Sequence, residues 1–167
     1  MKNNIKVGDT IPDFSLRDQD GNLFDTRSVK GKKKLVIFFY PQDGSHGCTK
    51  EACYFRDLTE VFDEAGAVVI GISGQSVESH KSFSEQYRLT YPILSDTGNK
   101  VRKLMGVPSS FFGLIPGRVT YITDINGKVI HIFNSQSEAE RHADEALKVC
   151  LLLKKSSQAG QEYSSQP

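Results

Sequence analysis

The feature that most constrains the fold is a near-continuous apolar run at residues 35–40, which Pro41 ends. A strand with apolar side chains on both faces is typical of a sheet that is buried on both sides. Residues 68–72 and 119–122 have the same character, and 91–94 are a shorter strand candidate. These strands need cover on both of their faces.

Helical periodicity and turn signals lie between these strands. Turn residues within 13–24 predict a hairpin near the N-terminus, and Asn126–Gly127 predicts a hairpin that ends with a strand at 129–133. Three segments have the spacing of helices, namely 46–65, 77–88 and 137–153. The order predicts an α/β fold, with a mixed central sheet, helices on both faces and an N-terminal hairpin.

Length and composition indicate one soluble globular domain. The chain has 167 residues, enough to bury an ordinary core. Its 21 basic and 20 acidic side chains nearly balance, so charge gives no reason to expect nucleic acid or an anionic membrane surface as a partner. From Ser156 the sequence is rich in Ser and Gln and lacks apolar anchors. We expect a domain at residues 1–153 and a disordered tail at 154–167.

No segment predicts export or membrane insertion. Residues 1–9 lack the apolar stretch of a signal peptide, and no run approaches the ~20 apolar residues of a membrane span. We expect a cytoplasmic protein, or one in an organelle such as the chloroplast if a targeting segment has been removed.

Three cysteines do not make a disulfide scaffold, and in a reducing compartment a close pair of cysteines is more often catalytic or metal-binding than structural.

Residues 40–53 carry the strongest chemical signal, because they lead from the end of a buried strand into the start of a helix. Ser45 is suited to cap that helix, which places Cys48 at the third helical position, in the first turn. Free backbone N–H groups and the helix dipole favour a thiolate there. Because the thiolate is the nucleophilic form of cysteine, this position predicts a reactive Cys48.

Helix geometry separates Cys48 from Cys53. At about 100° per residue, Cys48 lies within roughly 20° of Phe55 on the apolar stripe, and Cys53 lies about 140° further round on the polar face. A thiol on a charged face has no packing role, which favours a function for it. On an ideal helix the two Cα atoms are ~8.5–9 Å apart, beyond the ~7 Å limit of a disulfide. A bond between them would therefore require the start of the helix to unwind, at a cost that Gly44 and Gly47 lower.

The same segment resembles a known family. The pattern Pro41-x-x-x-Ser45-x-x-Cys48, followed by Cys53, is similar to that of the peroxiredoxins of the bacterioferritin-comigratory-protein or peroxiredoxin Q type. The resemblance covers about residues 5–150, and its further matches lie at 47–53, 55–57, 69–73, 94–96 and 116–120. It implies a thioredoxin-like fold.

The resemblance also implies a role for each matched residue. Cys48 would attack the peroxide O–O bond and become a sulfenic acid, and Cys53 would be the resolving thiol that condenses with it. Arg118 would stabilise the thiolate and orient the peroxide. Ser45 would hold the distal peroxide oxygen by its hydroxyl, and Pro41 would shield the thiolate from water.

Glu51, one turn after Cys48, would anchor Arg118. This pairing makes physical sense, because an unpaired carboxylate there would disfavour the thiolate. The resemblance further implies hydroperoxide substrates, recycling by thioredoxin or a similar dithiol reductant, and no cofactor or metal. The carboxyl end lacks a second resolving-cysteine motif, so we expect a monomer.

Two positions depart from the family pattern. Ser45 stands where the family usually has threonine, so the hydroxyl is kept but the methyl group that restricts its rotamer is lost. Peroxide positioning is therefore expected to be looser. His46 stands where this subfamily usually has proline, which affects local rigidity and pH response.

The cysteines and the histidine beside Cys48 allow other interpretations. A Cys–His pair of Cys48 with His46 is less favoured than an exposed histidine that replaces proline. A metal site made of His46, Cys48 and Cys53 lacks the CxxC spacing typical of zinc sites. Cys150 lies on the apolar face of the last helix and is most simply explained by packing. A thiol–disulfide oxidoreductase would need a CxxC pair, and a redox-switched binding protein or holdase that uses the same unwinding is the alternative from another functional class.

Overall fold

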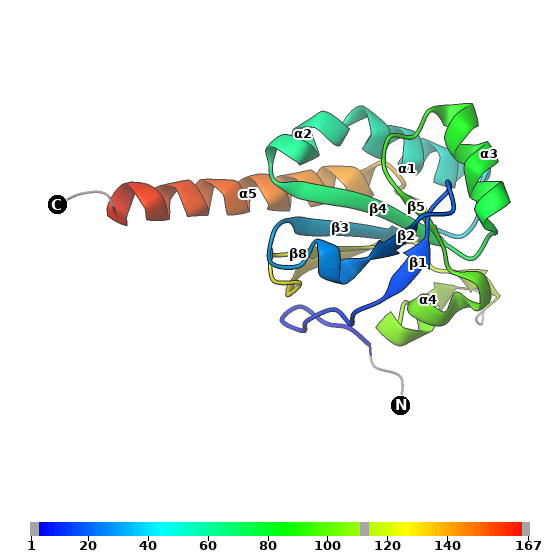
Figure 1. Ribbon diagram of the computed structural model, residues 1–167, viewed down its shortest axis with the longest axis horizontal. Coiled ribbons are helices and arrows are strands. Elements are labelled where there is room, and N and C mark those ends of the chain that lie inside the picture. The colour runs from blue at the N-terminus through cyan, green and yellow to red at the C-terminus, as the bar shows by residue number, and fades with distance from the viewer. Residues whose placement is uncertain (1–3, 111–113, 165–167) are drawn as a thin grey trace.

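The computed structural model describes the backbone of residues 4–110 and 114–164, and the side chains of residues 4–109 and 114–154. A central mixed sheet of seven strands has the order β2-β1-β5-β4-β3-β8-β9 (Figure 1). Its parallel strands are β3 (Lys34–Phe39), β4 (Ala67–Ser73) and β5 (Ile93–Ser95). The antiparallel strands are β1 (Ser15–Arg17), β2 (Leu23–Asp25), β8 (Val119–Thr123) and β9 (Val129–Asn134).

Helices cover both faces of this sheet. One face packs against α1 (His46–Asp57), α2 (Thr59–Glu64), α3 (Val77–Tyr87) and the first turns of α5 (Arg141–Ser164). The other face packs against α4 (Lys100–Met105) and the N-terminal segment. The shorter elements are η1 (Thr26–Ser28), η2 (Thr97–Asn99) and the pair β6 (Ser109–Ser110) and β7 (Ile115–Pro116).

Strand β3 shows why the sheet is buried on both sides. Its side chains alternate between two cores, with Val36 and Phe38 facing α1 and Leu35, Ile37 and Phe39 facing the opposite layer. All five are fully buried. Since a strand places successive side chains on opposite faces, an unbroken apolar run needs cover on both of them. The predicted mixed sheet with helices on both faces and an N-terminal hairpin is confirmed.

The helix expected at 46–65 is divided in two. Leu58 leaves the helical conformation, with φ −99° and ψ 5°, so α1 ends at Asp57 and α2 starts at Thr59. The hydroxyl of Thr59 donates to the carbonyl of Phe55 at 3.2 Å. Such back-bonding to the preceding turn bends helices, which is the physical reason for the division.

The last helix continues past the end that the apolar pattern predicts. The pattern stops at Leu153, whereas α5 runs to Ser164, and Figure 1 shows its later turns projecting away from the rest of the molecule. Periodicity detects only the turns that pack on the core, while Lys, Gln, Ala and Glu also favour a helix in solvent. The expected tail at 154–167 is helical up to Ser164, and residues 165–167 lie outside the described part. The division into a domain at 1–153 and a separate tail stays a prediction.

Helix α4 was not expected from the sequence. Its six residues are too few to give a periodic signal. Asp96 fixes its start, since the carboxylate accepts hydrogen bonds from the backbone N–H groups of Val101 at 3.0 Å and Arg102 at 2.9 Å.

Within the described ranges, no helix is both long enough and apolar enough to cross a membrane.

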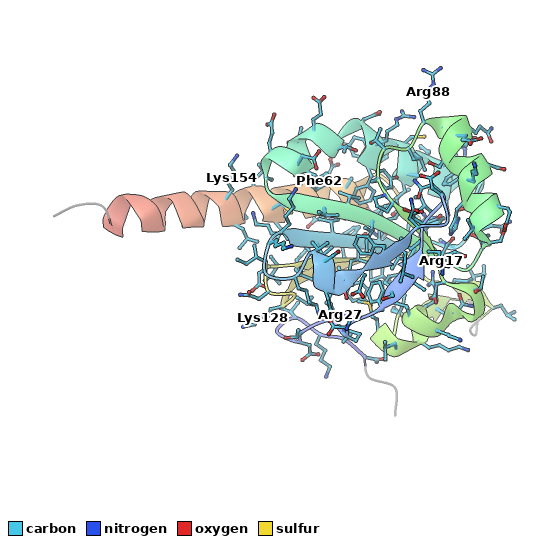
Figure 2. All side chains as sticks on the ribbon, in the orientation of Figure 1. Arg17, Arg27, Phe62, Arg88, Lys128 and Lys154 are labelled. Atoms are coloured by element: carbon cyan, nitrogen blue, oxygen red, sulfur yellow. The ribbon has the colours of Figure 1, made fainter. Side chains whose placement is uncertain are left out.

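The core between the sheet and α2 gives a direct test of the fold. Phe62, labelled in Figure 2, is fully buried, and its ring centroid lies 5.9 Å from that of Phe55. We expect Phe62→Ala to lower the free energy of unfolding by ~3–5 kcal/mol, because it leaves a cavity under α2. Urea denaturation measures this loss. Leu23→Ala is the control, because Leu23 is 59% exposed and should change the same quantity by ~0.5 kcal/mol or less. Equal losses in the two variants would contradict this packing.

Candidate active site

Cys48 lies in the first turn of α1, as predicted. Ser45 is the N-cap residue, and its side chain accepts a hydrogen bond from the backbone N–H of Cys48 at 3.3 Å. The side chain of Cys48 is buried among apolar residues of the core that includes Phe55. The helix start therefore fixes the sulfur at the boundary between the apolar core and the buried polar groups of the site.

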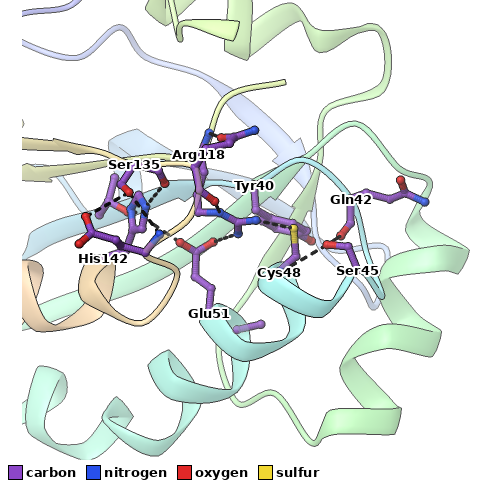
Figure 3. Close-up of polar contacts among 12 residues, drawn as sticks. Tyr40, Gln42, Ser45, Cys48, Glu51, Arg118, Ser135 and His142 are labelled. Atoms are coloured by element: carbon purple, nitrogen blue, oxygen red, sulfur yellow. Dashed lines mark hydrogen bonds and ion pairs between the residues drawn. The ribbon is translucent and has the colours of Figure 1, made fainter. Parts of the chain in front are cut away.

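Arg118 is the cation that reaches this sulfur. Its Nη2 lies 3.4 Å from Cys48 Sγ, and its Nη1 donates to Glu51 Oε1 at 3.0 Å (Figure 3). The two residues meet because β8 runs antiparallel to β3, with Val119 opposite Phe39. The start of β8 thus lies beside the end of β3, from which the chain enters α1. The sequence-predicted residues Cys48, Glu51 and Arg118 are brought together.

Gln136 holds Arg118 from the other side, and sequence reasoning missed it. Its side-chain oxygen accepts from the backbone N–H of Arg118 at 2.8 Å, and its backbone carbonyl accepts from Arg118 Nε at 3.1 Å. Its amide nitrogen donates to the carbonyl of Pro116 at 3.1 Å. Gln136 lies after β9, in a segment that has no motif of its own. Only the β8–β9 pairing brings it to the site.

Burial controls the charges of the Arg118–Glu51 pair. Glu51 is fully buried, and this burial raises the pKa of its carboxyl to about 8, because the attraction of Arg118 offsets only part of the lost hydration. Burial opposes the charge of Arg118, but Glu51 and Cys48 outweigh it and raise the pKa of the guanidinium. Arg118 therefore keeps its charge, while burial disfavours the ionised form of Glu51. The arrangement leaves a positive charge directed at Cys48.

A buried histidine lies behind Glu51 and was also missed. His142 Nε2 donates to the carbonyl of Ser135 at 2.8 Å, and its Nδ1 lies 2.8 Å from the hydroxyl of Thr120. Burial lowers the pKa of His142 to about 4, opposed by the Ser135 carbonyl and reinforced by Arg118. The neutral ring therefore accepts a hydrogen bond from Thr120. Glu51 Oε2 lies 3.7 Å from His142 Nδ1 and has no hydrogen-bond partner within the part of the chain that the structure describes.

A second buried arginine ties the two strand ends together. Arg102, on α4, donates to the carbonyl of Gly117 at 2.9 Å and to that of Tyr40 at 3.1 Å. These carbonyls flank the ends of β8 and β3 that carry Arg118 and lead to Cys48. Sequence analysis missed Arg102 because it missed α4.

The remaining predicted residues lie on α1, just before it and on α5. Cys53 is half-buried on α1, the same helix as Cys48. Pro41 is half-buried between β3 and α1, and His46 is exposed at the first position of the helix. Cys150 is fully buried, and burial raises the pKa of its thiol to about 11, which fits the packing role expected for it. Among the residues described, no three His, Cys, Asp or Glu side chains are grouped to hold a metal ion.

The neutral state of His142 gives a pH prediction. Its pKa is lowered from 6.5 to about 4, so the unfolded chain takes up a proton at a higher pH than the folded protein does. The folded protein therefore loses stability as the pH falls from about 6.5 to 4, by up to ~3 kcal/mol from this group. His142→Gln does not titrate and keeps a donor for Ser135. We expect the wild type to lose more stability than the variant over this range in urea titrations, and parallel losses would contradict the assignment.

The chain is similar to known proteins in both sequence and fold. The AhpC/TSA family model matches residues 7–132. The chain is 52% identical over 150 residues to the chloroplastic peroxiredoxin Q of Sedum lineare, which covers 90% of this chain and 80% of that one. Matches to several other chloroplastic relatives, such as the one from Arabidopsis thaliana, cover about two thirds of their length.

Two solved structures have the same fold. The crystal structure of the peroxidoxin BcpB from Mycobacterium tuberculosis superposes with a TM-score of 0.82 at 37% identity, over 89% of this chain and 98% of that one. The bacterioferritin comigratory protein of Xanthomonas campestris, described in a study of alkyl peroxide reduction, superposes with a TM-score of 0.77 at 28% identity, over 84% and 92%. The family match, the curated relatives and these structures agree with one another. The chain therefore belongs to the AhpC/TSA family, among the peroxiredoxins of the peroxiredoxin Q and bacterioferritin-comigratory-protein type.

Proposed function

We propose that the protein is a thiol peroxidase in which Cys48 reduces hydrogen peroxide and organic hydroperoxides. The single observation that carries the assignment is the contact of Arg118 Nη2 with Cys48 Sγ at 3.4 Å, inside a buried site. A fixed guanidinium stabilises a thiolate and also the negative charge that moves onto the peroxide oxygens. A cysteine that served only for packing would not need a buried cation at its sulfur.

The first step transfers oxygen to sulfur. The Cys48 thiolate attacks one peroxide oxygen, the O–O bond breaks, and the leaving oxygen takes a proton to become water or an alcohol. The sulfur is oxidised to a sulfenic acid and the peroxide is reduced. In this proposal Arg118 orients the peroxide, the Ser45 hydroxyl holds the distal oxygen, and Pro41 excludes water. Glu51 acts by holding Arg118 in place through its 3.0 Å contact.

The second step forms a disulfide within the chain. The Cys53 thiol attacks the Cys48 sulfenic acid, an S–S bond forms and water leaves. Both residues belong to α1, where ideal helix geometry holds their Cα atoms ~8.5–9 Å apart, so the first turns must unwind. Cys150 is a poor alternative partner, because its thiol is fully buried and burial keeps it protonated.

The physiological setting is part of the proposal. A thioredoxin or a similar dithiol returns two electrons to the Cys48–Cys53 disulfide and restores both thiols. The chloroplastic relatives support a chloroplast location, with the cytoplasm as the alternative. We take the monomer as the working unit, because both proposed cysteines lie in one helix of one chain.

Substitution of each cysteine tests this division of roles. We expect Cys48→Ser to abolish peroxide reduction. Cys53→Ser should form one sulfenic acid per chain but fail to turn over with thioredoxin, because no resolving thiol remains. Peroxide-dependent oxidation of reduced thioredoxin and mass spectrometry of the trapped sulfur provide the measurements.

Cys150→Ala is the matched control and should keep its turnover, since this thiol is fully buried and burial raises its pKa. Full peroxidase activity in Cys48→Ser would remove the assignment. If instead the wild-type protein consumed no reduced thioredoxin in the presence of peroxide, a redox-switched binding protein or holdase on the same fold would become the better account.

Substitution of the arginine tests the electrostatic part of the site. We expect Arg118→Met to slow oxidation of Cys48 by peroxide ~10²–10³-fold, the usual effect of removing one preorganised electrostatic contact. Arg118→Lys should recover only part of the rate, because lysine cannot present two parallel N–H donors. Single-turnover kinetics in a Cys53→Ser background isolate this step. Arg27→Met is the control, since that side chain is 71% exposed in η1, and equal rates in the Arg118 and Arg27 variants would exclude Arg118 from the site.

A further inference from the structure

The segment that joins β3 to α1 is held in place by the carboxylate of Asp43. Oδ1 accepts a hydrogen bond from the Tyr40 hydroxyl at 2.6 Å. Oδ2 accepts from the Ser79 hydroxyl at 2.8 Å and lies 2.6 Å from His80 Nδ1. Ser79 and His80 belong to the first turns of α3, so one carboxylate ties the segment to the end of β3 and to a separate helix.

Gln75 supports the backbone of the same segment. Its side-chain oxygen accepts from the backbone N–H of Asp43 at 3.0 Å and from the Ser73 hydroxyl at 2.6 Å. Its amide nitrogen lies 3.4 Å from the carbonyl of Pro41. The side chain of Asp43 is therefore fixed by Tyr40 and α3, and its backbone by Gln75 between β4 and α3.

The His80 ring lies between two oxygens that carry no proton when Asp43 is ionised. Nδ1 faces Asp43, and Nε2 lies 3.1 Å from the carbonyl of Leu94 in β5. A neutral imidazole can donate from only one nitrogen, so both contacts are attractive only when both nitrogens carry hydrogen. Burial opposes ionisation of Asp43, but the hydrogen bonds from His80 and Tyr40 outweigh it and keep its pKa below the ordinary value. The geometry therefore favours a buried ion pair.

The Asp43–His80 pair is almost completely shielded from solvent, since the side chain of His80 is 0% exposed and that of Asp43 is 6% exposed. Breaking a buried, hydrogen-bonded ion pair is costly, because each charge would be left uncompensated. The residues that follow Asp43 are Gly44 and the helix cap Ser45, whose side chain bonds the Cys48 N–H. Release of Asp43 would thus free the start of α1, and retention of Asp43 holds Cys48 beside Arg118.

We propose that Asp43 and His80 are positioning residues that clamp the start of α1 in its folded arrangement, and that this clamp must open before Cys48 can reach Cys53. The inference rests on the proposed function, because the Asp43–His80 pair would control the equilibrium between the two states of α1 that the two steps of that reaction require. With the clamp closed, Cys48 faces Arg118 and reacts with peroxide. With the clamp open, its sulfenic acid meets the Cys53 thiol, the S–S bond forms and water leaves. No further oxidant or reductant is needed for that step.

The clamp predicts different effects on the two steps. Loss of a hydrogen bond between charged groups shifts an equilibrium by ~10–100-fold, so His80→Gln, which can satisfy only one of the two oxygens, should favour the open state by such a factor. We expect disulfide closure after a peroxide pulse to become faster in the variant. The reaction of Cys48 with peroxide, measured in a Cys53→Ser background, should become slower or stay unchanged. General damage to the site would slow both steps.

Amide hydrogen exchange of the reduced protein tests the clamp without any peroxide. In His80→Gln, exchange at the amides of residues 45–49 should rise ~10–100-fold, while β4 and the later turns of α3 stay protected. Asp43→Asn is the second variant, since its amide can donate to a neutral His80 and accept from Tyr40. It should open the segment by a smaller factor than His80→Gln, and it carries the test if His80→Gln does not fold.

The matched control is His131→Gln, which breaks a different histidine–carboxylate pair, at 3.2 Å to Glu145, on β9 and α5. It should leave the exchange of 45–49 and both reaction rates unchanged. Unchanged exchange in both His80→Gln and Asp43→Asn, or slower disulfide closure with faster exchange, would overturn the clamp. If wild-type Cys48 formed no sulfenic acid at all, the proposed function would fail, while the exchange result would still decide whether the pair holds this segment.

Discussion

The contact between Arg118 and Cys48 is the interaction on which the rest of the site depends. A guanidinium buried beside a sulfur is stable only if its remaining donors are satisfied, and Glu51 and Gln136 accept from it at 3.0 and 3.1 Å. Glu51 is in turn buried so deeply that its pKa rises to about 8. The site therefore holds the positive charge of Arg118, directed at Cys48, and the carboxyl of Glu51, which only partly neutralises that charge.

The same architecture has to allow Cys48 to leave its place. Ideal helix geometry keeps Cys48 and Cys53 too far apart to bond, so a proposed reaction that links them needs a helix start that opens. The first turn of α1 is held by the Ser45 cap, by the contact of Cys48 with Arg118 and by the segment that Asp43 fixes against α3. The core beneath Phe55 and the division at Leu58 lie beyond it. Opening can thus be confined to one end of the helix.

Much of the fold was predictable because it follows from local patterns. The apolar run at 35–40 predicted β3 and its two-sided burial, and the spacing of Ser45 and Cys48 predicted the capped helix start, since capping depends on neighbouring residues. The break at Leu58 and helix α4 were not predictable, because a back-bonding threonine and a six-residue helix leave no periodic signal. The turns of α5 beyond Leu153 were missed because the sequence there has no apolar periodicity.

For the site, the sequence by itself determined which residues can do chemistry: a cysteine in a helix first turn, a second cysteine on the polar face, and, through the family resemblance, Arg118 and Glu51. Only the tertiary structure decided how they are supported. Gln136, His142, Arg102 and the Asp43–His80 pair come from separate loops and helices, and each is an ordinary polar residue in its own segment. Their roles arise from contacts across the sheet between positions far apart in the chain. Such contacts depend on strand order and burial, which no local pattern encodes.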